Sequence, residues 1–241
     1  MSAPLPANPG NQLLALLPSR DRERIFADGT LAELTAGSLV WEPGERTRHV
    51  HFPMASFVSQ LITVDGHTLE VGMIGDEGMC GHSLALGIDT AHLRALVQGS
   101  GTSLRCKAST FRQHLATSPA LRQVMHRYIH VILVQLAQTA ACMRFHTVEA
   151  RLARWLLMIQ DRAHADAFDM TQELLALMLG VRRVGITAAA HSLRTQELIA
   201  YTRGHITVLD RVGLEAAACV CYRSDLDIHR SMLGARRRTR V

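Results

Sequence analysis

Cationic and hydrogen-bonding side chains recur among small residues between positions 182 and 194. The set comprises Arg182, Arg183, Thr187, His191 and Arg194, with Val184 as an apolar member. Most of the intervening residues are glycine or alanine, which let a helix backbone approach a groove closely. Arginine offers a rigid fork of donors for guanine edges and phosphate oxygens, and valine can contact a thymine methyl group. The chemistry that suits these residues is the binding of duplex DNA.

The neighbouring elements are predicted to present this stretch as a recognition helix. Thr171 is a suitable N-cap for a short apolar helix, and Gly180 permits the left-handed backbone that ends it. A second helix then begins near Arg182. Two β-rich runs around a glycine turn follow, which predicts a hairpin with Arg203 and His205 near its tip. This order predicts a winged helix-turn-helix, and the alternative is a small helical subdomain with a solvated arginine-rich face.

The composition is that of a globular chain of 241 residues, 48% of them hydrophobic, with a net charge of +5. The excess of positive charge lies in the C-terminal part, which suits a polyanionic partner. No run reaches the roughly 18–20 apolar residues of a membrane span, and the first residues lack the pattern of a secretory signal, so we expect a cytoplasmic protein. The five cysteines are odd in number and scattered, which favours reduced thiols.

The remainder of the chain predicts an α+β architecture. Short β-like runs separated by turns, with Asp65-Gly66 as the clearest hairpin, predict an antiparallel, jelly-roll-like β-roll over residues 1–117. Residues 118–146 form a long helix, and residues 147–241 form the winged helix-turn-helix with a final helix over 213–234 and a basic tail. Apolar residues spaced by four and three along the long helix predict a seam for dimerisation: Leu121, Met125, Ile129, Ile132, Leu136, Ala140 and Met143. The alternative is an ordinary core helix in a monomer.

This combination resembles the CRP/FNR family of bacterial transcription regulators over nearly the whole chain. The resemblance is carried by TVEARLARWLL, FDMTQELLALMLGVRRVGITAAAHSL and LIAYTRGHITVLDRVGLE. It implies a homodimer, not an enzyme, that binds successive major grooves of double-stranded DNA and has RNA polymerase as a further partner. It also implies that Arg183 contacts a base or phosphate and Thr171 a phosphate. Val184 replaces a frequent Glu and Ala188 a basic residue, so we expect a sequence preference different from that of the cyclic-AMP receptor type.

The same resemblance implies an effector pocket formed by Gly81, His82, Ser83, Arg94 and Ala95. In cyclic-nucleotide binders a Glu at the position of His82 accepts a bond from the ribose hydroxyl, and an imidazole cannot reproduce that carboxylate. We therefore expect that cyclic AMP is not bound in the usual way, and the sequence identifies neither an effector nor a cofactor.

No metal site is predicted. Residues 1–30 lack the cysteine cluster of iron–sulfur members of the family. The pair His126 and His130, one helical turn apart, is weak evidence for a metal. Cys219 and Cys221 are expected to be buried thiols, because alternate residues of a helix do not face each other.

Two other functions remain as alternatives. A metal-dependent enzyme of the cupin type would use His49, His51 and Glu70, since His49 and His51 share one face of a strand. A cyclic-nucleotide-binding regulatory protein without transcriptional activity is the other, and the predicted winged helix argues against it.

Overall fold

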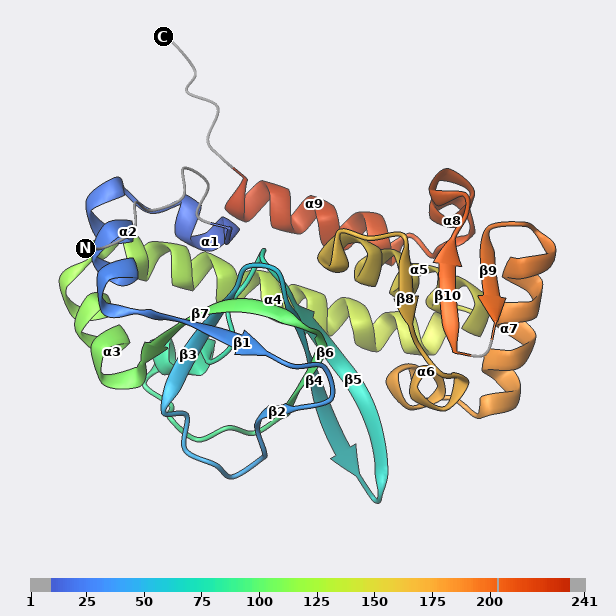
Figure 1. Ribbon diagram of the computed structural model, residues 1–241, viewed down its shortest axis with the longest axis horizontal. Helices are drawn as coiled ribbons and strands as arrows, with labels where there is room; N and C mark the ends of the chain where they lie inside the picture. Colours follow the sequence, from blue (N-terminus) through green and yellow to red (C-terminus); the bar gives the residue numbers. More distant parts are fainter. Residues whose placement is uncertain (1–9, 203, 235–241) are drawn as a thin grey trace, which may run out of the picture. The chain divides into compact units, whose positions relative to one another are not determined.

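The computed structural model describes residues 10–202 and 204–234, which fall into two compact units (Figure 1). The roll unit contains the described residues up to Val58, Ile74–Val134 and those from Asp227 onward. The helix-turn-helix unit contains Ser59–Met73 and Gln135–Leu226. Helix α4 (Pro119–Phe145) contributes residues to both units.

Antiparallel sheets form the β-roll, as predicted. One sheet has the order β1-β7-β3, from Thr30–Leu34, Gly101–Lys107 and His49–Pro53. The other has the order β2-β6-β4-β5, from Leu39–Trp41, Arg94–Gly99, Phe57–Val64 and His67–Ile74. The short β-like runs expected over residues 1–117 are strands of these two sheets, and β1 pairs with β7 over its whole length.

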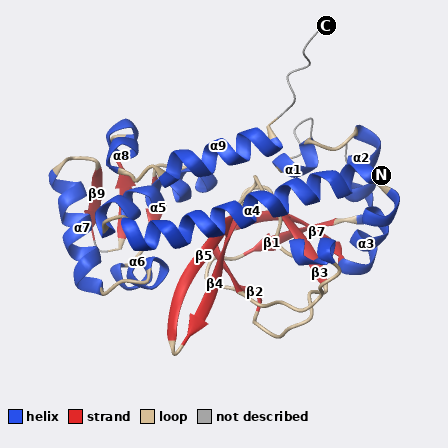
Figure 2. Cartoon of the chain, turned by 180° about the vertical axis from the view of Figure 1, so that it is seen from behind, coloured by secondary structure: helices blue, strands red, loops and turns tan. Residues whose placement is uncertain are grey.

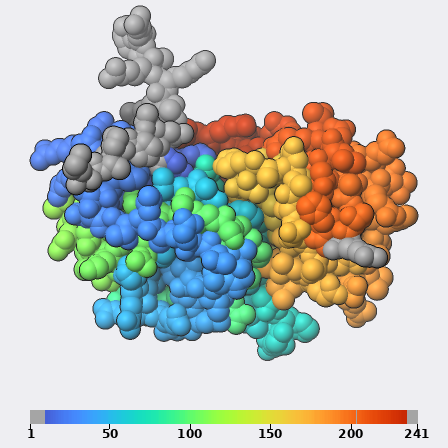
Figure 3. All heavy atoms as spheres, in the orientation of Figure 1, coloured from blue at the N-terminus to red at the C-terminus, as the bar shows by residue number. Residues whose placement is uncertain are grey.

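The β4–β5 hairpin turns at Asp65-Gly66, where the sequence predicted it. Both turn residues have positive φ, 50° at Asp65 and 76° at Gly66, which is the backbone that a tight two-residue hairpin requires. The tip, drawn in teal in Figure 3, lies at the surface, and Val64 beside it is 58% exposed. Residues 59–73 of this hairpin are part of the helix-turn-helix unit.

Short helices and the first half of α4 close the core of the roll unit. They are α1 (Gln12–Ala15), α2 (Ser19–Asp28), the 3-10 helix η1 (His82–Leu86) and α3 (Ala108–Thr117). Pro18 separates α1 from α2, because proline begins a helix well and cannot continue one. The core between these helices and the strands includes Phe52, Leu104 and Phe111.

Two residues of the predicted dimer seam belong to this core. Leu121 and Met125 are 1% and 0% exposed and pack within the same cluster as Phe52. They cannot contact a second subunit while this core is intact, which corrects their assignment. The periodicity showed an apolar side of α4, but that side is covered here by the chain's own roll.

Helices α5 to α9 and a small sheet build the helix-turn-helix unit (Figure 2). They comprise α5 (Val148–Ala163), α6 (Gln172–Leu179), α7 (Arg183–Thr195), α8 (Arg211–Ala217) and α9 (Cys221–Leu233), the last of which continues into the roll unit. The sheet has the order β8-β10-β9, from Ala167–Asp169, His205–Val208 and Ile199–Thr202. Thr147 caps α5 as predicted, its hydroxyl accepting from the backbone N–H of Ala150 at 3.3 Å.

The final helix expected over residues 213–234 is two helices. Ala218 has an extended backbone with ψ of 152°, which ends α8 before α9 begins at Cys221. Asp210 starts α8 by accepting from the N–H of Gly213 at 3.0 Å. The break changes the directions in which Cys219 and Cys221 point.

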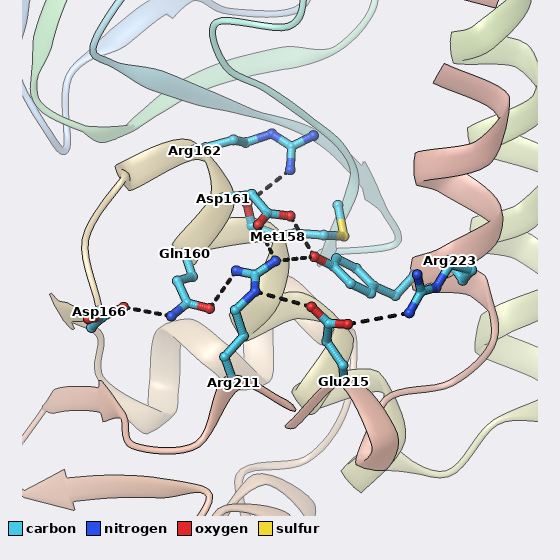
Figure 4. Close-up of polar contacts among 9 residues, drawn as sticks. Met158, Gln160, Asp161, Arg162, Asp166, Arg211, Glu215 and Arg223 are labelled. Atoms are coloured by element: carbon cyan, nitrogen blue, oxygen red, sulfur yellow. Dashed lines mark hydrogen bonds and ion pairs between the residues drawn. The ribbon is translucent and has the colours of Figure 1, made fainter. Parts of the chain in front are cut away.

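Arg211 ties α8 to α5 and α9 through a polar network (Figure 4). Its guanidinium contacts Asp161 at 2.7 Å, Gln160 at 2.8 Å and the hydroxyl of Tyr222 at 2.7 Å. Tyr222 donates in turn to Asp161 at 2.8 Å. Burial, with the nearby Asp161 carboxylate, raises the pKa of the Tyr222 phenol. The network fixes the orientation of the last two helices on α5.

Among the described residues, no single helix has both the length and the apolar character needed to cross a membrane. Helices α6 and α7 meet those criteria only when taken together, and they are bent by 107° relative to each other.

Candidate nucleic-acid interface

Local capping chemistry sets the geometry of the α6–α7 pair. The Thr171 hydroxyl accepts from the N–H of Leu174 at 3.2 Å and so begins α6. Gly180 ends it with φ of 62°, a left-handed conformation that glycine adopts without strain. Arg182 is the N-cap of α7, which leaves α6 at an angle of 107°. The sequence predicted the same roles: Thr171 as the start of the first helix, Gly180 as its end, and Arg182 as the start of the second helix.

Helix α7 has one buried and one exposed face. Its buried face consists of Ile186, Ala189, Ala190 and Leu193. All the residues predicted to bind DNA from this helix, and its N-cap, are exposed: Arg182, Arg183, Val184, Thr187, His191 and Arg194. Val184 is 79% exposed, which is unusual for valine and leaves its methyl groups free for an apolar contact. The structure therefore brings the predicted set to one solvent-facing side.

Several of these side chains have polar partners in the free protein. Arg183 forms an ion pair with Glu173 of α6 at 2.6 Å, with 64% and 63% of the two side chains exposed. Thr187 donates to the Gln172 side chain at 2.9 Å. Contacts this exposed contribute little to stability, typically about 0–1 kcal/mol, so a ligand can replace them at small cost.

The wing lies on the same side as the N-terminus of α6. A cavity of about 460 Å³ is lined by Thr171, Gln172, Glu173, Arg183, Arg194, Tyr201 and Gly204. It unites Thr171, Arg183 and Arg194, three of the predicted DNA-binding residues. His205 lies on β10 and contacts Asp169 of β8 at 2.8 Å, whereas Arg203 lies outside the described residues.

Tyr201 is a lining residue that the sequence analysis did not select. It stands on β9 opposite Ile206 of β10, and its side chain is half-buried. Burial raises the pKa of its hydroxyl, with the Glu173 carboxylate acting in the same direction. An aromatic residue beside the glycine of a wing turn was the available signal.

The side chains predicted to hold an effector contact other residues of the roll unit. The His82 ring packs edge-on against Tyr128, with ring centroids 6.0 Å apart, and burial lowers the pKa of His82. Arg94 pairs with Glu42 at 2.8 Å, and Ala95 is buried in β6. Gly81 has φ of 90° beside Val50, and Ser83 follows it in η1.

Of the residues proposed for a cupin-type site, the two histidines line one cavity and Glu70 contacts other residues. His49 and His51 line a cavity of about 390 Å³ together with Arg46 and Arg48. Burial, with the positive charges of the neighbouring His49 and Arg105 acting in the same direction, lowers the pKa of His51 to about 4. Glu70 accepts instead from Ser59 and from the indole N–H of Trp155.

One other cluster was missed. Over residues 10–202 and 204–234, the one group of at least three potential metal ligands consists of Cys142, His146, Cys219 and Cys221. Cys219 and Cys221 were predicted to lie in one helix, where their side chains would diverge. The break at Ala218 removes that premise.

Comparison with known proteins identifies the fold. Residues 150–217 match the family model of the Crp-like helix-turn-helix domain. The c-di-GMP-responsive global regulator CLP of Xanthomonas campestris superposes with a TM-score of 0.66 at 16% identity, covering 80% of this chain and 100% of that one. FixK2 of Bradyrhizobium japonicum gives 0.67 at 15% identity, covering 79% and 98%. No curated protein matches the sequence.

A structure from Eubacterium rectale, described as a regulator of the CRP/FNR family, gives a TM-score of 0.67 at 17% identity and covers 87% of this chain and 99% of that one. The chain thus has the fold of CRP/FNR transcriptional regulators, with antiparallel sheets, a long helix and a C-terminal helix-turn-helix of the Crp-like type. The predicted resemblance and fold class are confirmed.

Proposed function

We propose that this chain is a homodimeric, sequence-specific DNA-binding transcription regulator of the CRP/FNR type, acting in the cytoplasm with RNA polymerase as a partner and without enzymatic activity. The observation that carries the proposal is the exposed face of α7, where arginine, threonine, histidine and small residues gather opposite a buried apolar face. A helix of this kind fits the major groove of DNA.

The roles of the residues follow from their positions. Arg194 supplies a charged donor beside the α6 N-terminus, where free backbone N–H groups favour a phosphate, and Arg183 supplies one for a base edge. Val184 and Thr187 are both exposed on α7, and Val184 would offer its methyl groups to thymine. His205 on β10 is placed for a backbone contact from the wing.

Replacing Arg183 with alanine is expected to weaken specific binding by about 1–3 kcal/mol, roughly tenfold to a hundredfold, while the protein stays folded. The measurement is a mobility-shift titration on DNA selected from a random pool, repeated over a range of salt concentrations. The wild-type affinity should fall linearly on logarithmic axes because phosphate binding releases counterions.

Arg223→Ala is the matched control for this titration. Arg223 is also exposed and paired with a glutamate, at 3.4 Å from Glu215, but it lies on α9 and does not line the cavity. Equal losses in the two variants would show that net charge, not Arg183, governs binding. Selection of no sequence from the pool would remove the proposed function.

An exposed stripe on α4 supports a dimer. His126, His130, Leu133, Ala137, Ala140 and Arg144 are all exposed and are spaced by four and three residues. Leu133 is 60% exposed. This is the spacing of a coiled-coil seam, displaced by about one residue from most of the seam that the sequence suggested. Of the earlier set, Ala140 lies on this stripe, while Ile129, Ile132, Leu136 and Met143 are half-buried.

Leu133→Glu is expected to raise the dimer dissociation constant by about tenfold or more, because two like charges would meet at a paired seam. Sedimentation equilibrium measures the change directly. Leu31→Glu is the control, since Leu31 is a comparably exposed leucine, 67%, on β1. A wild-type protein that is monomeric at all accessible concentrations would contradict the dimer.

We also propose that cyclic AMP is not recognised in the usual way. His82 occupies the position of the expected glutamate, and the Arg94 guanidinium is already paired with Glu42. Calorimetric titration with cyclic AMP should therefore show no saturable heat. Cyclic di-GMP is a useful second arm because one structural relative responds to it. Saturable binding of cyclic AMP that Arg94→Ala abolishes would overturn this part of the proposal.

A further inference from the structure

Four potential ligands converge where the end of α4 meets the junction of α8 and α9. Cys142 and His146 lie one turn apart on and just after α4, Cys219 lies between α8 and α9, and Cys221 begins α9. One ligand atom from each of the four lies within 4.8 Å of all the others. The three cysteines are buried and His146 is half-buried. All four residues are in the helix-turn-helix unit.

The separations within the cluster suit a single tetrahedral ion. Cys142 Sγ and Cys219 Sγ are 3.5 Å apart, and Cys221 Sγ lies 3.4 Å from His146 Nδ1. Zinc bonds of about 2.3 Å to sulfur and about 2.0–2.1 Å to nitrogen separate tetrahedral ligands by about 3.5–3.8 Å. Three thiolates and one imidazole form an established set for structural zinc, and softer sulfur ligands disfavour magnesium and calcium.

The surroundings compensate the charge of such a site. Three thiolates and Zn²⁺ leave one net negative charge, and Arg151 and Arg154 both interact electrostatically with Cys142 and Cys219. The Gln138 amide donates to Cys221 Sγ at 2.9 Å, an outer-shell hydrogen bond of the kind that orients a thiolate ligand. Ala150 of α5 packs against the three cysteines and helps exclude water.

Two plainer explanations fit less well. A Cys142–Cys219 disulfide requires sulfur atoms about 2.05 Å apart, and it would give no role to His146 and Cys221. Ordinary buried thiols explain the packing of the cysteines and a hydrogen bond between Cys221 and His146, but not the convergence of all four ligand atoms within 4.8 Å of one another. The cluster brings together Cys142 and Cys219, which are 77 positions apart in sequence.

We propose that Cys142, His146, Cys219 and Cys221 bind one zinc ion that fastens the end of α4 to the α8–α9 junction. Four protein ligands leave no open position, so the ion is structural and not catalytic. The inference does not depend on DNA binding, because it concerns how the helix-turn-helix unit is held together.

The test uses the full-length protein purified under reducing conditions with zinc present. Mass spectrometry of metals should find about one zinc per chain. Removal of the metal with a chelator should lower Tm by about 5–10 °C. Titration of the reduced apoprotein with Co²⁺ should produce the visible absorption of a tetrahedral thiolate site, and added Zn²⁺ should abolish it.

Variants assign the ligands. His146→Gln and Cys221→Ser are each expected to weaken zinc binding by more than the about 10–100-fold that loss of an outer-shell partner costs. Cys106→Ser is the control, because Cys106 is a buried cysteine of β7 in the roll unit. Undiminished zinc in both ligand variants would overturn the proposal.

Two further results would also contradict the zinc site. A reduced wild-type protein that takes up neither Zn²⁺ nor Co²⁺ would show that the cluster is only packed thiols. Isolation of a Cys142–Cys219 disulfide in place of the metal would show a redox pair. If a variant does not fold, the Co²⁺ spectrum of the wild type still decides, since it requires no substitution.

Discussion

Asp225→Ala is expected to lower the free energy of unfolding by about 3–5 kcal/mol, the cost of leaving a buried charge without its partner. Asp225 of α9 contacts Arg154 of α5 at 2.5 Å, and each side chain is 10% exposed. Burial disfavours the charged guanidinium, but the Asp225 carboxylate outweighs it and raises the pKa of Arg154. The alanine variant therefore retains a buried guanidinium that has lost its ion-pair partner.

Chemical denaturation at neutral pH measures this loss, and two further variants interpret it. Asp227→Ala removes an exposed pair with Arg230, 62% and 65% exposed, and should cost less than about 1 kcal/mol. Replacing both buried partners with apolar residues, Arg154→Met with Asp225→Leu, should recover most of the stability. A double variant as unstable as Asp225→Ala would show that the pair itself, and not the orphaned charge, sets the magnitude.

Glu70→Gln is expected to remove a large pH dependence of stability. Burial raises the pKa of Glu70 from 4.5 to about 7, and hydrogen bonds from Ser59 and Trp155 oppose this only in part. Arg162 and Arg154 also favour the ionised form. Because the folded protein holds the proton more tightly than the unfolded chain does, the stabilisation is complete below about pH 4.5 and is lost as the pH rises through about 7.

The size of this effect follows from the shift. The difference between a pKa of about 7 in the folded protein and 4.5 in the unfolded chain corresponds to about 3 kcal/mol of unfolding free energy. Glutamine does not ionise, so the variant does not lose this stability as the pH rises. Glutamine keeps both contacts, accepting from the Trp155 indole, which lies 2.9 Å from Glu70, and donating to Ser59. The variant should therefore gain stability over the wild type between pH 4.5 and pH 7.

Unfolding by denaturant at a series of pH values tests this, with each variant compared with the wild type at the same pH. Glu33→Gln is the control, because it makes the same chemical change at an exposed glutamate of β1. Parallel pH profiles for the wild type and Glu70→Gln would show that the buried carboxyl does not titrate differently in the folded and unfolded states.

Features determined by neighbouring residues were predicted correctly from the sequence. Thr147 and Thr171 are N-caps, Gly180 ends α6, and Asp65-Gly66 turns the β4–β5 hairpin. Each depends on the conformational preference of one or two residues, so no knowledge of the tertiary structure was needed. The cationic and small residues of α7 were recognised from the sequence, and the structure leaves the cationic ones exposed.

Features determined by distant contacts could not be predicted. Glu70 and Trp155 are 85 positions apart, and an isolated glutamate in a strand suggests a solvated residue. The cysteine cluster depends on the break at Ala218, where neither glycine nor proline marks the end of a helix. Leu121 and Met125 were identified as apolar seam residues, but periodicity does not say whether the roll or a second subunit covers them.

The contact between Arg183 and Glu173 affects how selective α7 would be toward DNA. The Glu173 carboxylate lies 2.6 Å from the exposed Arg183 guanidinium. A base edge that binds Arg183 would therefore have to replace this carboxylate as the hydrogen-bond acceptor. Separating them costs little. A phosphate that approached the same spot would meet the repulsion of Glu173 once Arg183 had turned away. In the proposed complex with DNA, Glu173 would therefore penalise random contacts with the phosphate backbone more than a contact with a well-matched base pair.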